Sequence, residues 1–233
     1  TQHLGRAVAG RLKRVEMGNM SYYSAPQRWL LALVAVGCLL GPVCALASKS
    51  PTDTVKEAID DVLKVLKNEA YDREQRWLEI GRIIDARFDF RSMSQSVLAT
   101  NWRAATTEEK RQFVDFFSQY LEDTYRTKIE AYTDQKVVYI SEQVRKDRAI
   151  VDTEIVTDQN RIPVTYRLKN NDGTWFAYDV IIEGVSLVNN YRNTFNAIIK
   201  AEGIDGLLTN LESRISAYKV EHGISAEADG TPE

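Results

Sequence analysis

The sequence predicts an α+β fold in which helices come first, an antiparallel sheet follows and further helices close the chain. Apolar residues recur every three or four positions before residue 131 and again after residue 186, as in amphipathic helices. Between these regions, apolar residues alternate along four short runs joined by turn-rich connections, which indicates an antiparallel meander. Helices and strands that are segregated along the chain are typical of the α+β class.

Length, composition and charge limit the classes of protein to consider. The chain has 233 residues and a formal net charge of −3, which suits one domain with a short appendage. Its hydrophobic content of 44% is ordinary for a globular protein and too high for a disordered one. Basic residues form no cluster after the first part of the chain, so we expect no nucleic-acid partner.

Residues 20–47 have the organisation of a secretory signal peptide. Arg28 precedes an uncharged apolar run at 29–40, and a small-x-small site ends at Ala47. A positive residue, an apolar core and such a site together predict export. We therefore expect cleavage after Ala47, and we interpret residues 1–19 as an upstream extension of the reading frame.

Two alternatives to a cleaved signal remain open. The segment 29–47 is just long enough to span a bilayer as an uncleaved anchor, although Gly41-Pro42 divides it. A lipoprotein would instead be modified at Cys38 or Cys44. Cleavage would remove both cysteines, together with five basic residues and one acidic residue, a net of +4. The remainder would carry −7 against −3 for the whole chain, which argues against electrostatic adhesion to an anionic membrane.

Helix signals account for the chain up to residue 131. Ser50 is a capping residue that precedes Pro51, a favoured first helical residue. Thr106 and Glu109 form a capping-box pattern before a long run that carries several aromatic residues. We expect helices at 51–66, 73–85 and 107–131, and a mixed segment of short helix and loop at 88–98.

Four strands are predicted to form one meander, at 137–144, 149–157, 161–169 and 174–183. The turn from Asn170 to Gly173 is a strong hairpin signal between the last two strands. Alternation in the last strand places Trp175 and Asp179 on one face and Tyr178 and Val180 on the other.

The chain returns to helices after the sheet. Gly184 breaks the last strand, and an apolar run leads into a helix that we expect to end at Gly203. Asp205 then caps a last helix. The sequence from residue 221 onward becomes small and polar, so we expect one domain at 48–220 and a disordered tail at 221–233.

The sequence after residue 47 lacks most of the groups on which catalysis depends. It has one histidine, His222, and no cysteine, and it contains no P-loop or dinucleotide-binding fingerprint. Asp179 and Glu183 would share one face of the last strand, and an acid–base pair would need raised pKa values and a pocket. We expect instead an ion pair with a cation of the neighbouring strand, namely Arg161, Arg167 or Lys169. No catalytic residue, metal or cofactor is predicted.

One stretch carries a family resemblance. The chain reads WFAYDVIIEGVSLVNNYR from Trp175 to Arg192, which resembles the signature of the MlaC / toluene-tolerance auxiliary family. The resemblance extends over about Pro51 to Lys219. Its signature positions here are Trp175, Asp179, Glu183, Gly184, Ser186, Tyr191 and Arg192.

The resemblance implies a periplasmic phospholipid carrier that is not an enzyme. The implied fold is a twisted antiparallel sheet of the nuclear-transport-factor-like kind, wrapped by helices around an apolar cavity. The implied role is to move glycerophospholipids between the outer and inner membranes and so to maintain outer-membrane lipid asymmetry, as a monomer. The implied partners are an inner-membrane ABC transporter with an MCE-domain subunit and an outer-membrane lipoprotein–porin complex. A small-ligand-binding protein or an isomerase-like enzyme on the same fold is the alternative.

A lipid cavity would be lined by apolar residues from the inward faces of the strands and helices. Periodicity shows which face is apolar but not whether that face is packed or hollow, so ordinary core packing remains open for each position. The candidates are Phe90, Met93, Val97, Phe117, Tyr120, Tyr125, Val138, Ile140, Val151, Ile155, Val164, Tyr166, Tyr178, Val180 and Ile182.

Overall fold

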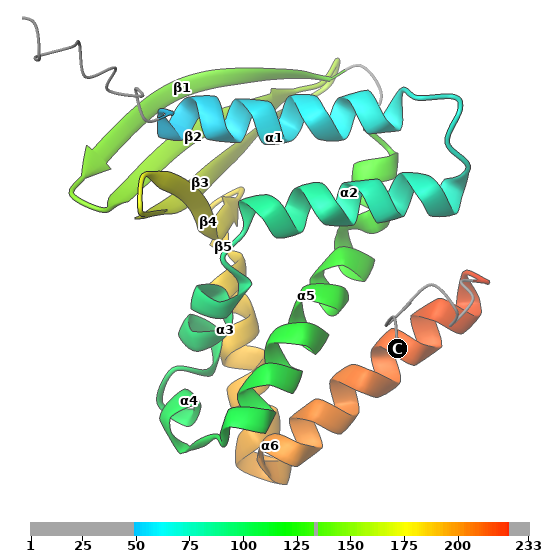
Figure 1. Cartoon of the computed structure of the whole chain (residues 1–233), viewed down its shortest axis with the longest axis vertical. Helices are drawn as coiled ribbons and strands as arrows, with labels where there is room; N and C mark the ends of the chain where they lie inside the picture. Colours follow the sequence, from blue (N-terminus) through cyan, green and yellow to red (C-terminus); the bar gives the residue numbers. More distant parts are fainter. Residues whose placement is uncertain (1–48, 133–134, 224–233) are drawn as a thin grey trace, which may run out of the picture. The chain divides into compact units, whose positions relative to one another are not determined.

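The computed structural model describes residues 49–132 and 135–223. These residues all belong to the larger of the two units into which the chain divides, Ala47–Glu233. The expected upstream extension, the signal peptide and most of the expected tail lie outside the described residues. The described part consists of helices, then an antiparallel sheet, then a long helix, so the predicted α+β class is confirmed (Figure 1).

The helices before the sheet follow the prediction closely. The mixed segment at 88–98 forms one short helix, and a further short helix, which was not predicted, follows Ala99. Ala99 interrupts the helical backbone with a φ of 51°. The second helix also runs two residues further than predicted, to Arg87. The five helices are α1 (Pro51–Leu66), α2 (Arg73–Arg87), α3 (Phe90–Leu98), α4 (Thr100–Ala104) and α5 (Thr107–Glu130).

Side-chain caps fix where these helices begin. Ser50 Oγ accepts from the backbone N–H of Asp53 at 3.0 Å, as its position before Pro51 predicted. The capping box at the start of α5 is also present, since Thr106 Oγ1 accepts from the N–H of Glu109 at 3.2 Å while the Glu109 carboxylate accepts from the N–H of Thr106.

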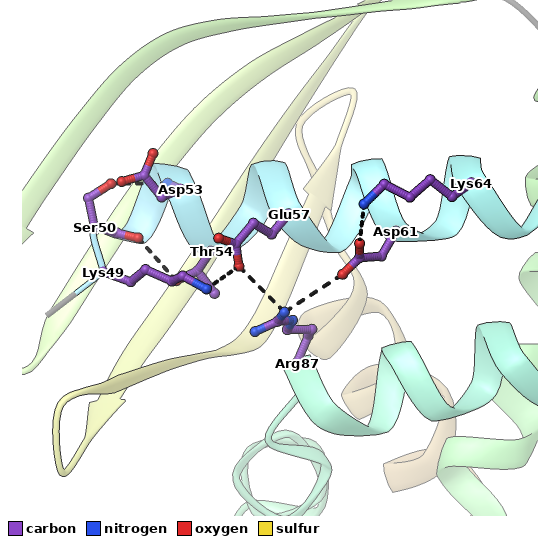
Figure 2. A network of polar contacts seen from close by, with 8 residues as sticks. All are labelled: Lys49, Ser50, Asp53, Thr54, Glu57, Asp61, Lys64 and Arg87. Atoms are coloured by element: carbon purple, nitrogen blue, oxygen red, sulfur yellow. Dashed lines mark hydrogen bonds and ion pairs between the residues drawn. The ribbon is translucent and has the colours of Figure 1, made fainter.

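Ion pairs join α1 to the end of α2. Arg87, the last residue of α2, lies between two carboxylates of α1, with its Nη2 atom 3.6 Å from Glu57 and 3.9 Å from Asp61 (Figure 2). Lys49 also pairs with Glu57, at 2.5 Å. These side chains are partly exposed, so each pair adds little free energy, but together they align the two helices.

The described residues form a sheet of five antiparallel strands in sequence order, namely the four predicted strands and a two-residue fifth strand that was not predicted. The strands are β1 (Lys136–Arg145), β2 (Arg148–Val156), β3 (Arg161–Asn171), β4 (Thr174–Ile182) and β5 (Val185–Ser186). Two-residue turns close the last two hairpins, with positive φ at Asp172 and Gly173 and again at Glu183 and Gly184. Positive φ at both central residues suits the right-handed twist of the strands. The predicted hairpin at Gly173 and the predicted strand break at Gly184 are therefore confirmed.

Two bulges correct the predicted strand faces. The register skips Ile140 in β1 and Tyr178 in β4, so each of these residues is an extra residue in its strand. After the bulge, Trp175 and Ala177 share a face with Val180, whereas simple alternation had placed Trp175 on the opposite face. One inserted residue reverses the facing of every residue beyond it, and alternation alone does not reveal the insertion.

The closing helices are confirmed as two segments that meet at Gly203. Helix α6 (Leu187–Glu221) contains a non-helical backbone at Gly203, with φ 75° and ψ −176°. His222 follows the helix, and its ring stacks on Tyr218 at 4.0 Å between centroids. The tail from residue 224 lies outside the described residues.

Among the described residues, most buried apolar side chains fall into two separate clusters. One cluster lies among α3, α5 and α6 and includes Phe113, Phe117 and Phe195. The other joins α1 to the sheet and includes Val55, Val151 and further residues of β2, β3 and β4. A domain usually has one contiguous core. Apolar residues that belong to neither cluster are therefore candidates for contact with a ligand.

Candidate functional site

The sheet carries one continuous apolar surface, on the face that packs against α1. The register pairs Val151 with Tyr166 and Ile155 with Ile162, and Val164 with Ile182. Paired residues share a face, so these side chains lie side by side across β2, β3 and β4. We call this surface the apolar sheet face, and its residues are Val151, Ile155, Ile162, Val164, Tyr166, Val180 and Ile182.

Helix α1 covers only part of the apolar sheet face. Val55 and Ile59 of α1 pack in the cluster that contains Val151 and Tyr166. Val164 and Val180 are buried but belong to neither core cluster. Ile155, Ile162 and Ile182 are only half-buried. Apolar surface therefore remains partly accessible at Ile155, Ile162 and Ile182, and an apolar ligand could lie there.

Three predicted lining residues on the strands do not belong to this surface. Val138 pairs with Glu154, which places it on the opposite face. Ile140 is the bulged residue of β1 and is 56% exposed. Tyr178 is the bulged residue of β4 and packs against the helical cluster instead. Their predicted inward orientation toward the other strand candidates was wrong because the two bulges interrupt the alternation.

The predicted helix residues pack in a different cluster from the sheet residues. Met93, Val97 and Phe117 are at most 1% exposed and fill the helical core. Phe90, Tyr120 and Tyr125 are half-buried against the same core. The rings of Tyr120 and Tyr191 lie edge to face at 5.7 Å, so this region has the geometry of a packed aromatic core.

Two tyrosines bring polar atoms to the apolar surface. Burial raises the pKa of Tyr166 far above its usual value, and the neighbouring Tyr139 and Tyr132 add to the shift. Burial, Asp60 and Tyr132 raise the pKa of Tyr139 to about 12. Both hydroxyls therefore stay protonated at neutral pH and can donate hydrogen bonds. The prediction missed Tyr139, since the bulge at Ile140 places it on the same face as Val151.

The two acids of β4 do not form a catalytic pair. Asp179 is 2% exposed and accepts from Ser186 Oγ at 2.8 Å, from the N–H of Val188 at 3.1 Å and from Arg167 at 3.3 Å. The expected ion pair with a cation of the neighbouring strand is confirmed for Arg167. The Asp179 carboxylate of this pair is buried, whereas the Arg167 side chain is partly exposed. Glu183 lies in the exposed turn after β4, so it does not share the buried position of Asp179.

A polar hollow lies on the other face of the sheet. It has a volume of about 420 Å³ and is bordered by the start of α3 and by β3 and β4. Its lining is mostly polar and consists of Phe88, Asp89, Arg91, Ser92, Gln95, Lys169, Asn171 and Phe176. This composition does not suit an acyl chain, so the hollow is not the apolar cavity that the resemblance implies.

Two kinds of feature are absent from the described residues. Within 49–132 and 135–223, no group of three or more His, Cys, Asp or Glu side chains is arranged to hold a metal ion. None of the helices in the same ranges combines the length and apolar character needed to cross a bilayer.

The described residues form an α+β domain, in which helices pack around an antiparallel sheet with one apolar face. A solved structure shares this architecture. A solved phospholipid-binding protein from Ralstonia solanacearum, in complex with a phospholipid, matches with a TM-score of 0.65 and 27% identity. The match covers 71% of this chain and 96% of that chain. The family model described as MlaC protein matches residues 56–213, and the chain belongs to this family.

Two curated relatives agree with the family assignment. The toluene tolerance protein ttg2D of Pseudomonas putida is 26% identical over 223 residues, which cover 89% of this chain and 96% of that protein. The intermembrane phospholipid transport system binding protein MlaC of Haemophilus influenzae is 25% identical over 126 residues. That match covers 52% of this chain and 59% of the relative's length.

Proposed function

We propose that the protein binds phospholipids and carries them through the periplasm between the inner and outer membranes, as part of the upkeep of outer-membrane lipid asymmetry. The observation that carries the proposal is that Ile155, Ile162 and Ile182 of the apolar sheet face are half-buried and belong to neither core cluster. Membership in the MlaC family and the likeness to a protein solved with bound phospholipid support it.

The physical need for a carrier is large. A diacyl lipid that leaves a bilayer exposes about 30 methylene groups to water, at about 0.8 kcal/mol each, which amounts to roughly 20–25 kcal/mol. Spontaneous crossing of an aqueous compartment is therefore negligible. A carrier must supply apolar surface for the acyl chains, and it needs no nucleophile, metal or nucleotide for this task.

We place the acyl chains against the apolar sheet face, next to α1 and α2. Ile155, Ile162 and Ile182 would contact the chains, since they are only half-buried. The neighbouring Val164 and Val180 lie outside both core clusters and complete this part of the face. The hydroxyl groups of Tyr139 and Tyr166 would donate hydrogen bonds to ester or phosphate oxygens. Of the predicted helix residues, the half-buried Phe90, Tyr120 and Tyr125 stay candidates for the far end of the chains.

Location and partners follow from the same proposal. Residues 20–47 would direct export and be removed after Ala47, leaving the domain at 48–220 in the periplasm. The membrane partners would be an inner-membrane ABC transporter with an MCE-domain subunit and an outer-membrane lipoprotein–porin complex. Intact mass measurement of the periplasmic protein tests the first point, and a chain that begins before Ser48 would contradict it.

An isomerase-like enzyme on the same fold is the less favoured alternative. Such an enzyme would need a free acid or histidine beside the apolar surface. The buried carboxylate of Asp179 is already engaged by Arg167, Ser186 and the start of α6. This engagement favours a structural role for the residue.

A transfer assay tests the proposed function. Donor vesicles that contain a fluorescent, self-quenched phospholipid are mixed with unlabelled acceptor vesicles, with and without the protein. A carrier increases the rate of dequenching in proportion to its concentration, because each molecule moves lipid through water. A rate equal to that of the vesicles alone would contradict transport, even if lipid binding were retained.

A further inference from the structure

Three cations stand in one row on the polar face of the sheet. Arg145 of β1 is paired with Arg148 of β2, and Arg148 is paired with Lys169 of β3. Paired residues share a face and adjacent strands are about 4.8 Å apart, so the row spans roughly 10 Å. Like charges directly opposite each other destabilise a sheet, so the fold gains nothing from this arrangement. We call these three residues the cation row.

The cation row is only weakly neutralised from within the chain. Arg148 and Asp147 approach to 3.6 Å, and Lys169 and Asp89 approach to 3.7 Å, both longer than a good charged hydrogen bond. Arg145 is exposed and forms no ion pair within the described part of the chain. The Arg148 guanidinium lies 4.8 Å from the centre of the Tyr178 ring, which holds its charge in place while its side chain stays 47% exposed.

The surroundings limit what can meet the cation row. Asp152 and Glu154 lie on the same face, further along β2, where Glu154 is paired with Arg161 at 2.9 Å, and the whole chain has a net charge of −3. A broad anionic plane such as a bilayer would meet these acids as well as the cations. A narrow acidic segment of another protein can reach the cations without covering Asp152 and Glu154, so charge complementarity favours a protein.

We propose that the cation row is a docking surface for an acidic segment of a protein partner. The surface lies on the opposite side of the sheet from the apolar sheet face, so docking and ligand binding use separate residues. The row therefore orients the domain on its partner without covering the bound ligand.

A charge-reversal pair tests the proposal. Arg145→Glu changes the row, and Lys136→Glu makes the same change at the other end of β1 on the same face, where Lys136 is paired with Val156. The probe is a fluorescein-labelled hexaglutamate peptide, followed by fluorescence anisotropy at low ionic strength. We expect affinity to fall about fivefold or more in Arg145→Glu and less than about twofold in Lys136→Glu.

Three further results distinguish docking of a protein segment from an effect of net charge and from binding to a membrane. Equal losses in the two variants would overturn the proposal, since they would report net charge alone. Binding of the protein to vesicles with phosphatidylglycerol, lost in Arg145→Glu while the peptide fails to bind, would assign the row to a membrane instead. The lipid content of Arg145→Glu, measured by native mass spectrometry, should equal that of the wild type, so failure here leaves the carrier function untouched.

Discussion

The carboxylate of Asp179 accepts a hydrogen bond from the backbone N–H of Val188 at 3.1 Å and so joins the last long strand to the first turn of α6. Ser186 donates to the same carboxylate at 2.8 Å while its own Oγ accepts from the N–H of Asn189 at 3.1 Å. The carboxylate thus caps the helix, neutralises Arg167 and fixes the hairpin between them. Asp179 and Ser186, two of the predicted signature residues, are thus joined directly by a hydrogen bond.

Removal of this carboxylate should destabilise the fold strongly. Asp179→Ala leaves the N–H of Val188 and the Arg167 guanidinium without their acceptor, and we expect a loss of about 3 kcal/mol in the free energy of unfolding. Ser186→Ala removes one cap and should cost about 1 kcal/mol. Urea unfolding measures both losses. Equal costs in the two variants would contradict the central role of Asp179, and the exposed Asp158→Ala serves as control.

Two glycines should respond in opposite ways to alanine. Gly184 has a φ of 82° and open space where a Cβ would lie, so Gly184→Ala should cost about 1–2 kcal/mol from backbone strain alone. Gly81 lies inside α2, where a Cβ would make an ordinary contact at 3.7 Å with Glu122. Gly81→Ala should therefore stabilise the fold by up to about 1 kcal/mol. Thermal unfolding of both variants checks the contrast, which a loss at Gly81 would refute.

Stability should depend on pH through Glu122. Burial, then the charges of Asp85 and Asp123, raise its pKa from 4.5 to about 7, against a smaller opposing effect of Arg126. At a pH between 4.5 and about 7, Glu122 is therefore protonated in the folded chain and ionised in the unfolded chain. The contribution of Glu122 to the free energy of unfolding is greatest below pH 4.5 and is lost as the pH rises through about 7.

Glu122→Gln should remove this dependence. We expect the difference in unfolding free energy between about pH 5 and about pH 8 to shrink by about 2 kcal/mol relative to the wild type. The exposed Glu212→Gln is the matched control and should leave the difference unchanged. A pH profile of Glu122→Gln that coincides with the wild type would show that Glu122 does not titrate in this range.

A bulky residue on the apolar sheet face should displace lipid. Val180→Trp should reduce the amount of co-purified phospholipid at least about twofold, because the indole occupies volume that the acyl chains need. Val220→Trp makes the same substitution at a position that is 83% exposed and should leave the lipid content unchanged. Phosphate analysis of purified protein measures the content, and circular dichroism verifies folding. Full lipid content in a folded Val180→Trp would remove this residue from the site.

Much of the fold could be predicted from local chemistry. The caps at Ser50 and Thr106 and the turns at Gly173 and Gly184 depend on residues close in sequence, so their signals are readable without tertiary information. The break at Gly203 is equally local, because a positive φ favours glycine.

The sequence predicted less well which face of the sheet each strand residue occupies and which residues belong to the site. The bulges at Ile140 and Tyr178 depend on pairing with neighbouring strands, which alternation does not encode. Apolar periodicity could not separate Phe117, which fills the helical core, from Val180, which lies outside both clusters. The burial of Asp179 was also missed, since its partners come from β3 and from the helix that follows.

Native mass spectrometry of the purified protein tests phospholipid binding without any labelled probe. We predict that the domain carries additional mass equal to a diacyl phospholipid and that this mass is lost on denaturation. Incubation of delipidated protein with phospholipid vesicles should restore the loaded form, because the apolar sheet face then regains its ligand. A protein that is free of lipid as purified and remains so after incubation with vesicles would contradict a carrier function.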